Sequence, residues 1–328
     1  MKDQPMILEV HVFAYNHEDF IERTLKSVLA QETEFAFGLR IHDDASSDAT
    51  VEIIERTLAA SDIPWELVRA TENRFSSGVD FWHDFLATST APFVAVLDGD
   101  DLWLDPSKLQ RQMDLLLANP SAAICHHRVV ELLGESMHET EWPPPQFREE
   151  SVPGSQLSEF NPISTSSVVL RRAFLPTRMP AGFNELRVAD YAVWALTSQG
   201  REIAYIDRPM GAYRIHEGSM YSSQSKRHRI LEEMKTRQFI GLHVAEVDRP
   251  AWRTGLLNAI DYWLGENARL ADDLHRIADE LADVLARNAN LQHDLADVIA
   301  VVDELQSSTS WRVTAPLRRL RTAINHRP

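Results

Sequence analysis

Residues 93–101 read FVAVLDGDD, an apolar run that ends in three carboxylates around one glycine. Five consecutive apolar residues are typical of a strand that is covered on both faces, as strands are in parallel sheets. In such sheets ligands bind beyond the carboxyl ends of the strands. The residues that follow the run, Asp98 to Asp101, are therefore the first candidates for a functional site.

Strand and helix patterns alternate through the N-terminal part of the chain. Apolar or alternating segments predict strands at residues 8–13, 39–41 and 66–68, and helical spacing predicts helices at 20–29, 51–58 and 81–86. With the run at 93–97 they predict an α/β fold with a mostly parallel, Rossmann-like sheet flanked by helices. Since no Gly-x-Gly-x-x-Gly follows the first strand, we do not expect the dinucleotide site of dehydrogenases.

The composition of the chain indicates which partners and which cellular compartment to expect. The chain has 328 residues, a formal net charge of −16 and a single cysteine, Cys125. The negative charge argues against nucleic acid as a partner, because phosphate backbones bind basic surfaces. One cysteine excludes an internal disulfide framework and a cysteine-based zinc cluster. No apolar stretch approaches the ~20 residues of a membrane span, and the N-terminal MKDQP lacks the apolar core of a signal peptide, so we expect a cytoplasmic protein.

Three carboxylates stand within four residues at the end of the quoted strand. Asp98, Asp100 and Asp101 repel one another, and oxygen ligands of this type suit Mg²⁺ or Mn²⁺. Gly99 allows the backbone to bend sharply between them. A divalent ion held by few protein ligands keeps positions open for substrate phosphates. The alternative interpretation is a solvated acidic turn that caps the helix starting near Pro106.

Polar residues also follow the first two strands. Tyr15-Asn16 comes after the first strand, where the ring is suited either to stacking on a nucleobase or to packing. Asp43-Asp44-Ala45-Ser46-Ser47-Asp48 comes after the second strand. One of these acids could accept hydrogen bonds from a base or a ribose, while Ser47 or Asp48 could cap the next helix.

In their order and spacing, these segments resemble glycosyltransferase family 2, whose members are inverting enzymes with the GT-A fold. The matching segments are Ala14-Tyr15-Asn16 with Leu25 to Gln31, Asp43 to Asp48, Leu97 to Trp103, and Asp105 to Gln112. The resemblance covers residues 6–220. The Gln-x-x-Arg-Trp motif of processive synthases is absent, so the resemblance is to the non-processive bacterial type.

The resemblance implies roles for particular residues. It places the nucleotide-sugar against Ala14, Tyr15, Asn16, Asp44, Asp98, Gly99, Asp100 and His216, with Asp44 at the nucleobase. It draws the metal ligands from Asp98, Asp100, Asp101 and His216, the last of which belongs to a Tyr-Arg-x-His segment at 213–216.

The catalytic base of the family lies in an acidic pair that opens a helix in the second half of the domain. The matching segment is Val188 to Trp194, so Asp190 is the candidate base, while Ala189 stands where the family often has another acid. A carboxylate within hydrogen-bond reach can take the proton of an attacking acceptor hydroxyl. The alternative role for Asp190 is that of an N-terminal helix acid stabilised by the helix dipole.

The resemblance implies a metal-dependent, inverting glycosyltransferase with Mn²⁺ or Mg²⁺ as cofactor. It would move a sugar from a UDP-, dTDP- or GDP-linked donor to a hydroxyl of a glycan or lipid-linked acceptor, in cell-envelope polysaccharide or glycolipid synthesis. One alternative is a nucleotidyltransferase, which usually carries a basic Gly-rich loop that is not visible here. Another is a catalytically degenerate, oligomerising scaffold, against which the intact Asp98, Asp100 and Asp190 argue.

The resemblance and the patterns together divide the chain. We predict a GT-A domain at residues 1–225, with a nucleotide-binding half at 1–130 and an acceptor half at 131–225, and a helical extension at 226–310. Residues 270–305 carry apolar residues at alternating steps of four and three, which is typical of a coiled coil. Asn288 falls at an a position and favours parallel two-stranded pairing. We therefore predict a homo-oligomer, with a long helix packed on its own catalytic domain as the alternative.

The last segment, residues 311–328, is basic and amphipathic. It has five arginines, no acid and a tryptophan at its start. Such a segment suits an anionic membrane surface, which predicts peripheral contact with the inner face of the plasma membrane. The alternative is docking on the acidic body of the protein.

Overall fold

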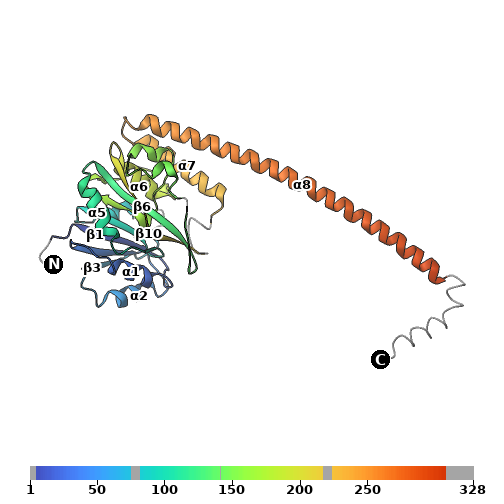
Figure 1. Ribbon diagram of the computed structural model, residues 1–328, viewed down its shortest axis with the longest axis horizontal. Helices are drawn as coiled ribbons and strands as arrows, with labels where there is room; N and C mark the ends of the chain where they lie inside the picture. The colour runs from blue at the N-terminus through green and yellow to red at the C-terminus, as the bar shows by residue number, and fades with distance from the viewer. Residues whose placement is uncertain (1–4, 75–81, 141, 217–223, 308–328) are drawn as a thin grey trace, which may run out of the picture. The chain divides into compact units, whose positions relative to one another are not determined.

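The computed structural model describes residues 5–74, 82–140, 142–216 and 224–307 (Figure 1). The chain divides into two compact units, Met1–Asp261 and Tyr262–Pro328. Within these described ranges, the helices are all too short or too polar to cross a membrane. The predicted tail at 311–328 lies outside the described residues.

The N-terminal part of the sheet contains the four strands that the sequence predicts, and they are parallel. They are β1 (Leu8–Ala14), β2 (Phe37–Asp43), β3 (Trp65–Arg69) and β4 (Phe93–Asp98). β1 pairs with β2 on one side and with β4 on the other, and β3 pairs with β2. The residues that follow β1, β2 and β4 therefore share one edge of the sheet, where ligands of such folds bind.

Beyond β4 the sheet becomes mixed. Its further strands are β5 (Leu102–Trp103), β6 (Ala122–Leu133), β7 (Ser136–His138), β8 (Ser151–Pro153), β9 (Val169–Arg171) and β10 (Glu202–Ile215). The strand order is β3-β2-β1-β4-β9-β6-β10-β5, with β7 beside β6 and β8 beside β10. Because β5 directly follows the acidic turn and pairs with β10, the end of β10 is brought beside that turn.

Helices cover both faces of the sheet, as expected for this class (Figure 1). The α-helices are α1 (Ile21–Leu29), α2 (Thr50–Leu58), α4 (Trp82–Ala87), α5 (Lys108–Ala118), α6 (Ala189–Ser198), α7 (Lys226–His243) and α8 (Arg249–Ser307). Short 3₁₀ turns are η1 (Pro145–Phe147), η2 (Gly154–Ser158), η3 (Thr165–Ser167), η4 (Arg172–Phe174) and η5 (Phe183–Glu185).

The residues of β4 alternate between two hydrophobic cores, one on each face of the sheet. Val94 and Val96 join the core that contains α4 and α6, whereas Ala95 and Leu97 join the core that contains α1, α2 and α5. Successive side chains of a strand point to opposite faces. Since both faces are covered, the strand is apolar throughout, and each buried Val or Leu stabilises the fold by ~1.5–3 kcal/mol.

The first turns of α8 belong to the N-terminal unit. Trp252 is buried, and its ring centroid lies 5.8 Å from that of Tyr191 in α6. Gly255 packs so closely on the Ser158 carbonyl group that a Cβ there would overlap it. The helix from Tyr262 onward belongs to the other unit, where apolar residues at the predicted heptad positions such as Leu270 are more than half exposed.

Candidate active site

Asn16 joins the loop after β1 to the loop after β2. Its backbone is in the left-handed region, at φ 53°, which asparagine tolerates better than most residues. The Asn16 N–H donates to Ser46 Oγ (2.9 Å), and Asn16 Oδ1 accepts from the Ser47 N–H (2.8 Å). The side chain therefore supports the loop, and its contact with a nucleotide-sugar stays a prediction. The neighbouring Tyr15 is 42 % exposed and accessible to a ligand.

Asp44 is buried at the base of these loops. Its N–H donates to the Ala14 carbonyl oxygen (2.9 Å), which links the ends of β1 and β2. Its Oδ1 accepts from the Arg74 N–H (2.8 Å) and lies 3.7 Å from His42 Nε2. The Asp44 carboxylate thus already holds the segment after β3 in place.

The acidic turn after β4 is packed so tightly that position 99 requires glycine. The Gly99 N–H donates to the Phe13 carbonyl oxygen (2.7 Å), and a Cβ on Gly99 would lie 2.6 Å from His17 Nδ1. On the other side of the turn, Thr24 Oγ1 of α1 lies 2.8 Å from the Gly99 carbonyl oxygen and 2.6 Å from that of Asp101. The turn is therefore held between β1 and α1.

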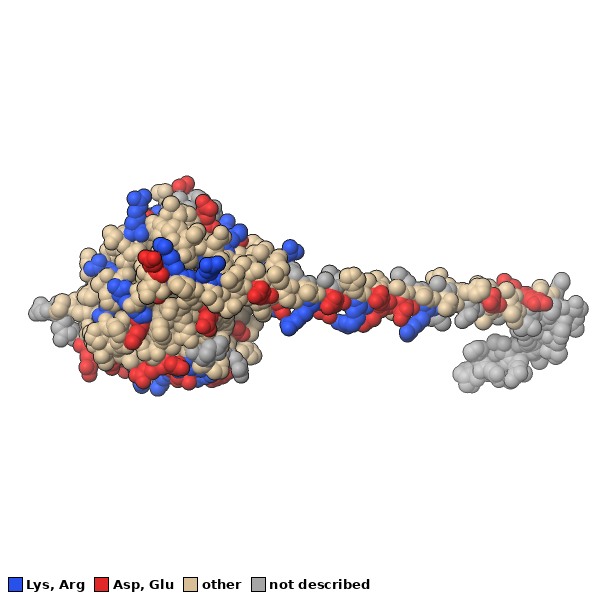
Figure 2. Space-filling view, turned by 90° about the horizontal axis from the view of Figure 1, so that it is seen from above, with Lys and Arg blue, Asp and Glu red and all other residues tan. Residues whose placement is uncertain are grey.

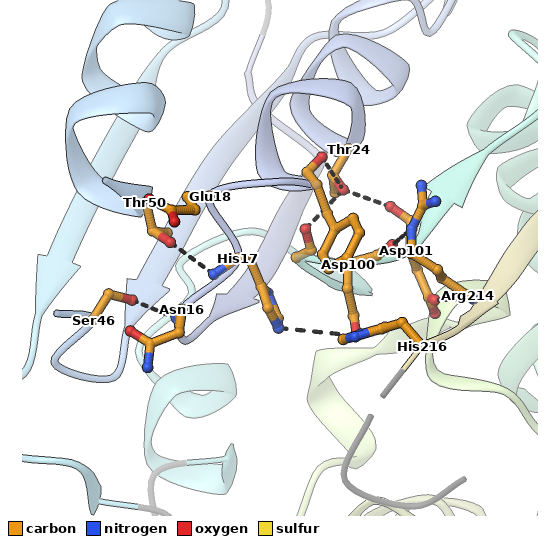
Figure 3. A network of polar contacts seen from close by, with 12 residues as sticks. Asn16, His17, Glu18, Thr24, Ser46, Thr50, Asp100, Asp101, Arg214 and His216 are labelled. Carbon is orange, nitrogen blue, oxygen red and sulfur yellow. Dashed lines mark hydrogen bonds and ion pairs between the residues drawn. The ribbon is translucent and has the colours of Figure 1, made fainter. Parts of the chain in front are cut away.

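Two histidines flank the Asp100 carboxylate (Figure 3). Asp100 Oδ2 lies 3.1 Å from His216 Nε2 and 3.9 Å from His17 Nε2. Although burial raises the pKa of Asp100, the hydrogen bond from His216 and the charge of His17 bring that pKa below its ordinary value. Arg214 of β10 makes two hydrogen bonds to the turn. Its Nε donates to the Asp100 carbonyl oxygen (2.6 Å), and its backbone N–H donates to Asp101 Oδ1 (2.8 Å).

Asp98 and Asp101 have the opposite electrostatic character. Burial, followed by the charge of Asp100, raises the pKa of both well above its ordinary value. The charge of Asp190 raises the pKa of Asp98 further, while a hydrogen bond from Thr165 lowers it. Carboxylates that are buried and repel one another in this way are stabilised when a cation joins them.

Asp190 lies in the first turn of α6. Burial raises the pKa of Asp190 to about 6, with a hydrogen bond from the Tyr191 N–H lowering it and the charge of Glu233 raising it. A carboxylate with this pKa is deprotonated at neutral pH and still basic enough to accept a proton.

The structure connects residues from the turn after β4, from α6 and from the end of β10. Asp98, Asp100 and Asp101 interact electrostatically with one another, Asp190 interacts with Asp98, and His216 interacts with Asp100. Tyr15, Asn16 and Asp44 lie on the adjoining loops. His17 and Thr24 also contact the acidic turn and were not predicted from the sequence. The position of His17 directly after Tyr15-Asn16 was the available signal; nothing local marks Thr24, whose partners lie in the turn after β4.

The chemistry of Asp98 and Asp100 fits a divalent cation. In the part of the chain that the structure describes, no three His, Cys, Asp or Glu side chains are arranged as a complete cation site. Mg²⁺ is commonly held by one or two carboxylates together with substrate phosphates, which is what this pair offers. Asp101 Oδ1 is already an acceptor for the Arg214 N–H.

Comparison with known proteins adds independent support. Residues 9–175 match the sequence model described as glycosyl transferase family 2. An uncharacterized protein of Mycobacterium tuberculosis is 32 % identical over 221 residues, which are 67 % of this chain and 62 % of that protein. The chain thus spans less than two thirds of the length of this relative.

A more distant relative and a solved structure extend the comparison. The Escherichia coli UDP-Glc:alpha-D-GlcNAc-diphosphoundecaprenol beta-1,3-glucosyltransferase WfgD is 26 % identical over 65 % of this chain and 79 % of its own. The mannosyltransferase PcManGT from Pyrobaculum calidifontis, solved with GDP-Man and Mn²⁺, has a TM-score of 0.51 and 16 % identity over 81 % of this chain and 80 % of its own. The chain belongs to glycosyl transferase family 2 and has the GT-A fold.

Proposed function

We propose that the chain transfers a sugar, with inversion, from a nucleotide-diphosphate-sugar to an acceptor hydroxyl. The observation that supports this proposal is the electrostatic interaction between Asp190 in the first turn of α6 and Asp98 at the end of β4. This interaction connects the candidate base to the acidic turn at the edge of the sheet. Membership of glycosyl transferase family 2 supports sugar transfer over the nucleotidyltransferase alternative.

The chain's residues support a single displacement. Asp190 accepts the proton of the acceptor hydroxyl while the hydroxyl oxygen forms a bond to the anomeric carbon. The bond between that carbon and the diphosphate oxygen breaks, and the nucleoside diphosphate leaves from the opposite face. Asp98 and Asp100, with His216 beside them, would hold Mn²⁺ or Mg²⁺, which neutralises the charge of a departing diphosphate. We propose that Tyr15 and Asp44 bind the nucleoside.

A lipid-diphosphate-linked sugar is the acceptor class that we propose, in cell-envelope polysaccharide or glycolipid synthesis. The support is the E. coli relative, whose name gives UDP-Glc as donor and a diphosphoundecaprenol-linked GlcNAc as acceptor. The donor class that we propose is a UDP-, dTDP- or GDP-linked sugar.

A thermal-shift screen of nucleotide-sugars with Mn²⁺, followed by donor hydrolysis with metal or with EDTA, tests the proposed function. We expect one donor to stabilise the protein most and its hydrolysis to stop in EDTA. Stabilisation by no donor, together with no hydrolysis in either condition, would refute the proposal and favour the scaffold alternative.

Oligomerisation through residues 270–305 is a second proposal. Ile277, Leu281 and Val284 are each more than half exposed at heptad positions of the Tyr262–Pro328 unit. Acidic and basic side chains are interspersed along the side of α8 seen in Figure 2. Burial of the apolar seam would stabilise pairing of two such helices. Light scattering on a chain ending near residue 265 should show a lower oligomeric state than the full chain, and an unchanged state would exclude this segment.

Peripheral membrane contact through residues 311–328, and with it a position at the inner face of the plasma membrane, is proposed from composition alone. Co-sedimentation with anionic vesicles should fall when these residues are removed. Equal sedimentation of both chains would favour docking of the tail on the protein itself.

A further inference from the structure

The aromatic ring of Phe20 lies among the side chains that surround the acidic turn after β4. Phe20 immediately precedes α1 and is partly buried. Its ring centroid lies 4.6 Å from that of His216 and 6.5 Å from that of His17. The Arg214 guanidinium carbon lies over the same ring, 4.8 Å from the centroid. One ring is therefore the neighbour of groups from the loop after β1 and from the end of β10.

These three neighbours of Phe20 also approach Asp100 (Figure 3). Asp100 Oδ2 lies 3.1 Å from His216 Nε2 and 3.9 Å from His17 Nε2. Arg214 Nε donates to the Asp100 carbonyl oxygen (2.6 Å). The ring of Phe20 thus packs against the same side chains that contact the candidate cation ligand.

Backbone hydrogen bonds fix the position from which the ring projects. The Phe20 N–H donates to the His17 carbonyl oxygen (2.9 Å), and the Phe20 carbonyl oxygen accepts from the Thr24 N–H (3.1 Å). Thr24 Oγ1 in turn lies 2.8 Å from the Gly99 carbonyl oxygen and 2.6 Å from that of Asp101. The ring is therefore held by the same first turn of α1 that holds the acidic turn.

An aromatic ring suits these neighbours better than an aliphatic side chain does. A guanidinium group within about 6 Å of a ring centroid is attracted by the negative face of the ring. Two tilted rings with centroids about 4.5–7 Å apart are also attracted beyond the effect of apolar burial. A leucine in place of Phe20 would keep much of the burial but would lose both interactions.

We propose that Phe20 is a positioning residue of the transfer site, where its ring fixes the orientation of His216 and Arg214 around Asp100. This inference rests on the proposed function. Groups that orient the ligands of a metal commonly change its affinity about 10–100-fold when they are removed. Phe20 therefore supports the binding of the cation and of the donor's diphosphate, and the acceptor should be bound independently of it.

Mn²⁺ binding to the full chain, measured without nucleotide from the electron paramagnetic resonance signal of the free ion, tests this inference. For Phe20→Leu we expect the Kd for Mn²⁺ to rise about 10-fold, whereas Phe20→Tyr keeps the ring and should bind Mn²⁺ like the wild type. The control is Phe35→Leu, a partly buried phenylalanine before β2 that packs on the core containing α1, α2 and α5. It should lower the Tm as Phe20→Leu does but leave the Kd unchanged.

Transfer kinetics with the donor found by the thermal-shift screen and a synthetic GlcNAc-diphospho-lipid give a second readout. In Phe20→Leu the donor KM should rise about 10-fold, while the acceptor KM stays unchanged. A wild-type Kd for Mn²⁺ in Phe20→Leu would overturn the inference, as would equal losses in Phe20→Leu and Phe20→Tyr, or no binding of Mn²⁺ to the wild type. A wild type that binds Mn²⁺ but hydrolyses no nucleotide-sugar would refute the proposed function, and the comparison of Kd values would still decide the role of Phe20 at the cation site.

Discussion

The turn after β2 and the turn after β4 both place adjacent acids at the same edge of the sheet, but the surroundings of their carboxylates differ. Asp44 accepts a hydrogen bond from the Arg74 N–H and lies beside His42. Asp98 and Asp101 are buried close to further carboxylates, and their pKa values are raised well above the ordinary range. Asp44 therefore stabilises the loop that carries Arg74. Asp98 and Asp101 instead repel neighbouring carboxylates, and a bound cation would reduce that repulsion.

The difference arises from the neighbours that tertiary structure supplies. In the turn after β2, the Asp44 carboxylate accepts a hydrogen bond from the Arg74 N–H, in the segment after β3. The β4 turn meets Asp190 from α6, with Arg214 and His216 at the end of β10. A cation site is therefore expected after β4 and not after β2, and four predictions test this contrast.

Replacement of Asp100 by asparagine should have the largest effect on activity. The change keeps the shape of the side chain but removes charge from the candidate cation site, and stabilisation of a leaving diphosphate is worth several kcal/mol. We expect kcat to fall about 10³-fold while the Tm stays close to that of the wild type. The exposed Asp62→Asn serves as the control, and equal activity of the two variants would remove Asp100 from the site.

The pH dependence should follow Asp190. Because its pKa is raised to about 6, the base is protonated at lower pH, and kcat/KM should decrease about 10-fold per pH unit below that value. A stopped assay from pH 4.5 to 8 measures this limb. A profile that stays flat down to pH 5 would argue against Asp190 as the base.

Asp98→Asn should stabilise the protein in the absence of metal. A carboxylate whose pKa is higher in the folded than in the unfolded state binds more protons when folded, so its contribution to stability decreases as pH rises between the two pKa values. Asparagine has no proton to lose, so the variant avoids this decrease in stability. We expect a gain of about 1 kcal/mol in unfolding free energy, which raises the Tm at pH 7 in EDTA by a few degrees. Added Mn²⁺ should raise the Tm of the wild type more than that of the variant; the reverse order would contradict a cation site here.

Asp44→Asn should have the smallest effect. It should lower the stability of the protein, whereas Asp98→Asn should raise it. The amide oxygen can still accept from the Arg74 N–H, but a hydrogen bond to a neutral acceptor is weaker than one to a carboxylate. We expect a loss of about 0.5–1 kcal/mol in unfolding free energy, measured by urea denaturation, with no difference between EDTA and Mn²⁺. A gain in stability would show that Asp44 belongs with the repelling acids.

Local patterns in the sequence were sufficient to predict the parallel strands and the acids that follow them. The continuous apolar run of β4 and the helical spacing of α1 reflect burial of a face, which depends on residues a few positions apart. From the sequence, Gly99 was expected to allow a sharp bend between the acids. The structure gives a different reason for glycine, which is the close approach of the Phe13 carbonyl group and His17.

The sequence by itself determined which residues end the strands of this protein, because strand and helix periodicities are local. Only the tertiary structure decided that β9 and β6 lie between β4 and β10, and that Arg214 donates hydrogen bonds to Asp100 and Asp101 of the acidic turn. Those contacts join distant segments through sheet order and helix packing, so no spacing in the sequence encodes them. The contacts of Arg214 also act on the acids of the turn, because its backbone hydrogen bond lowers the pKa of Asp101.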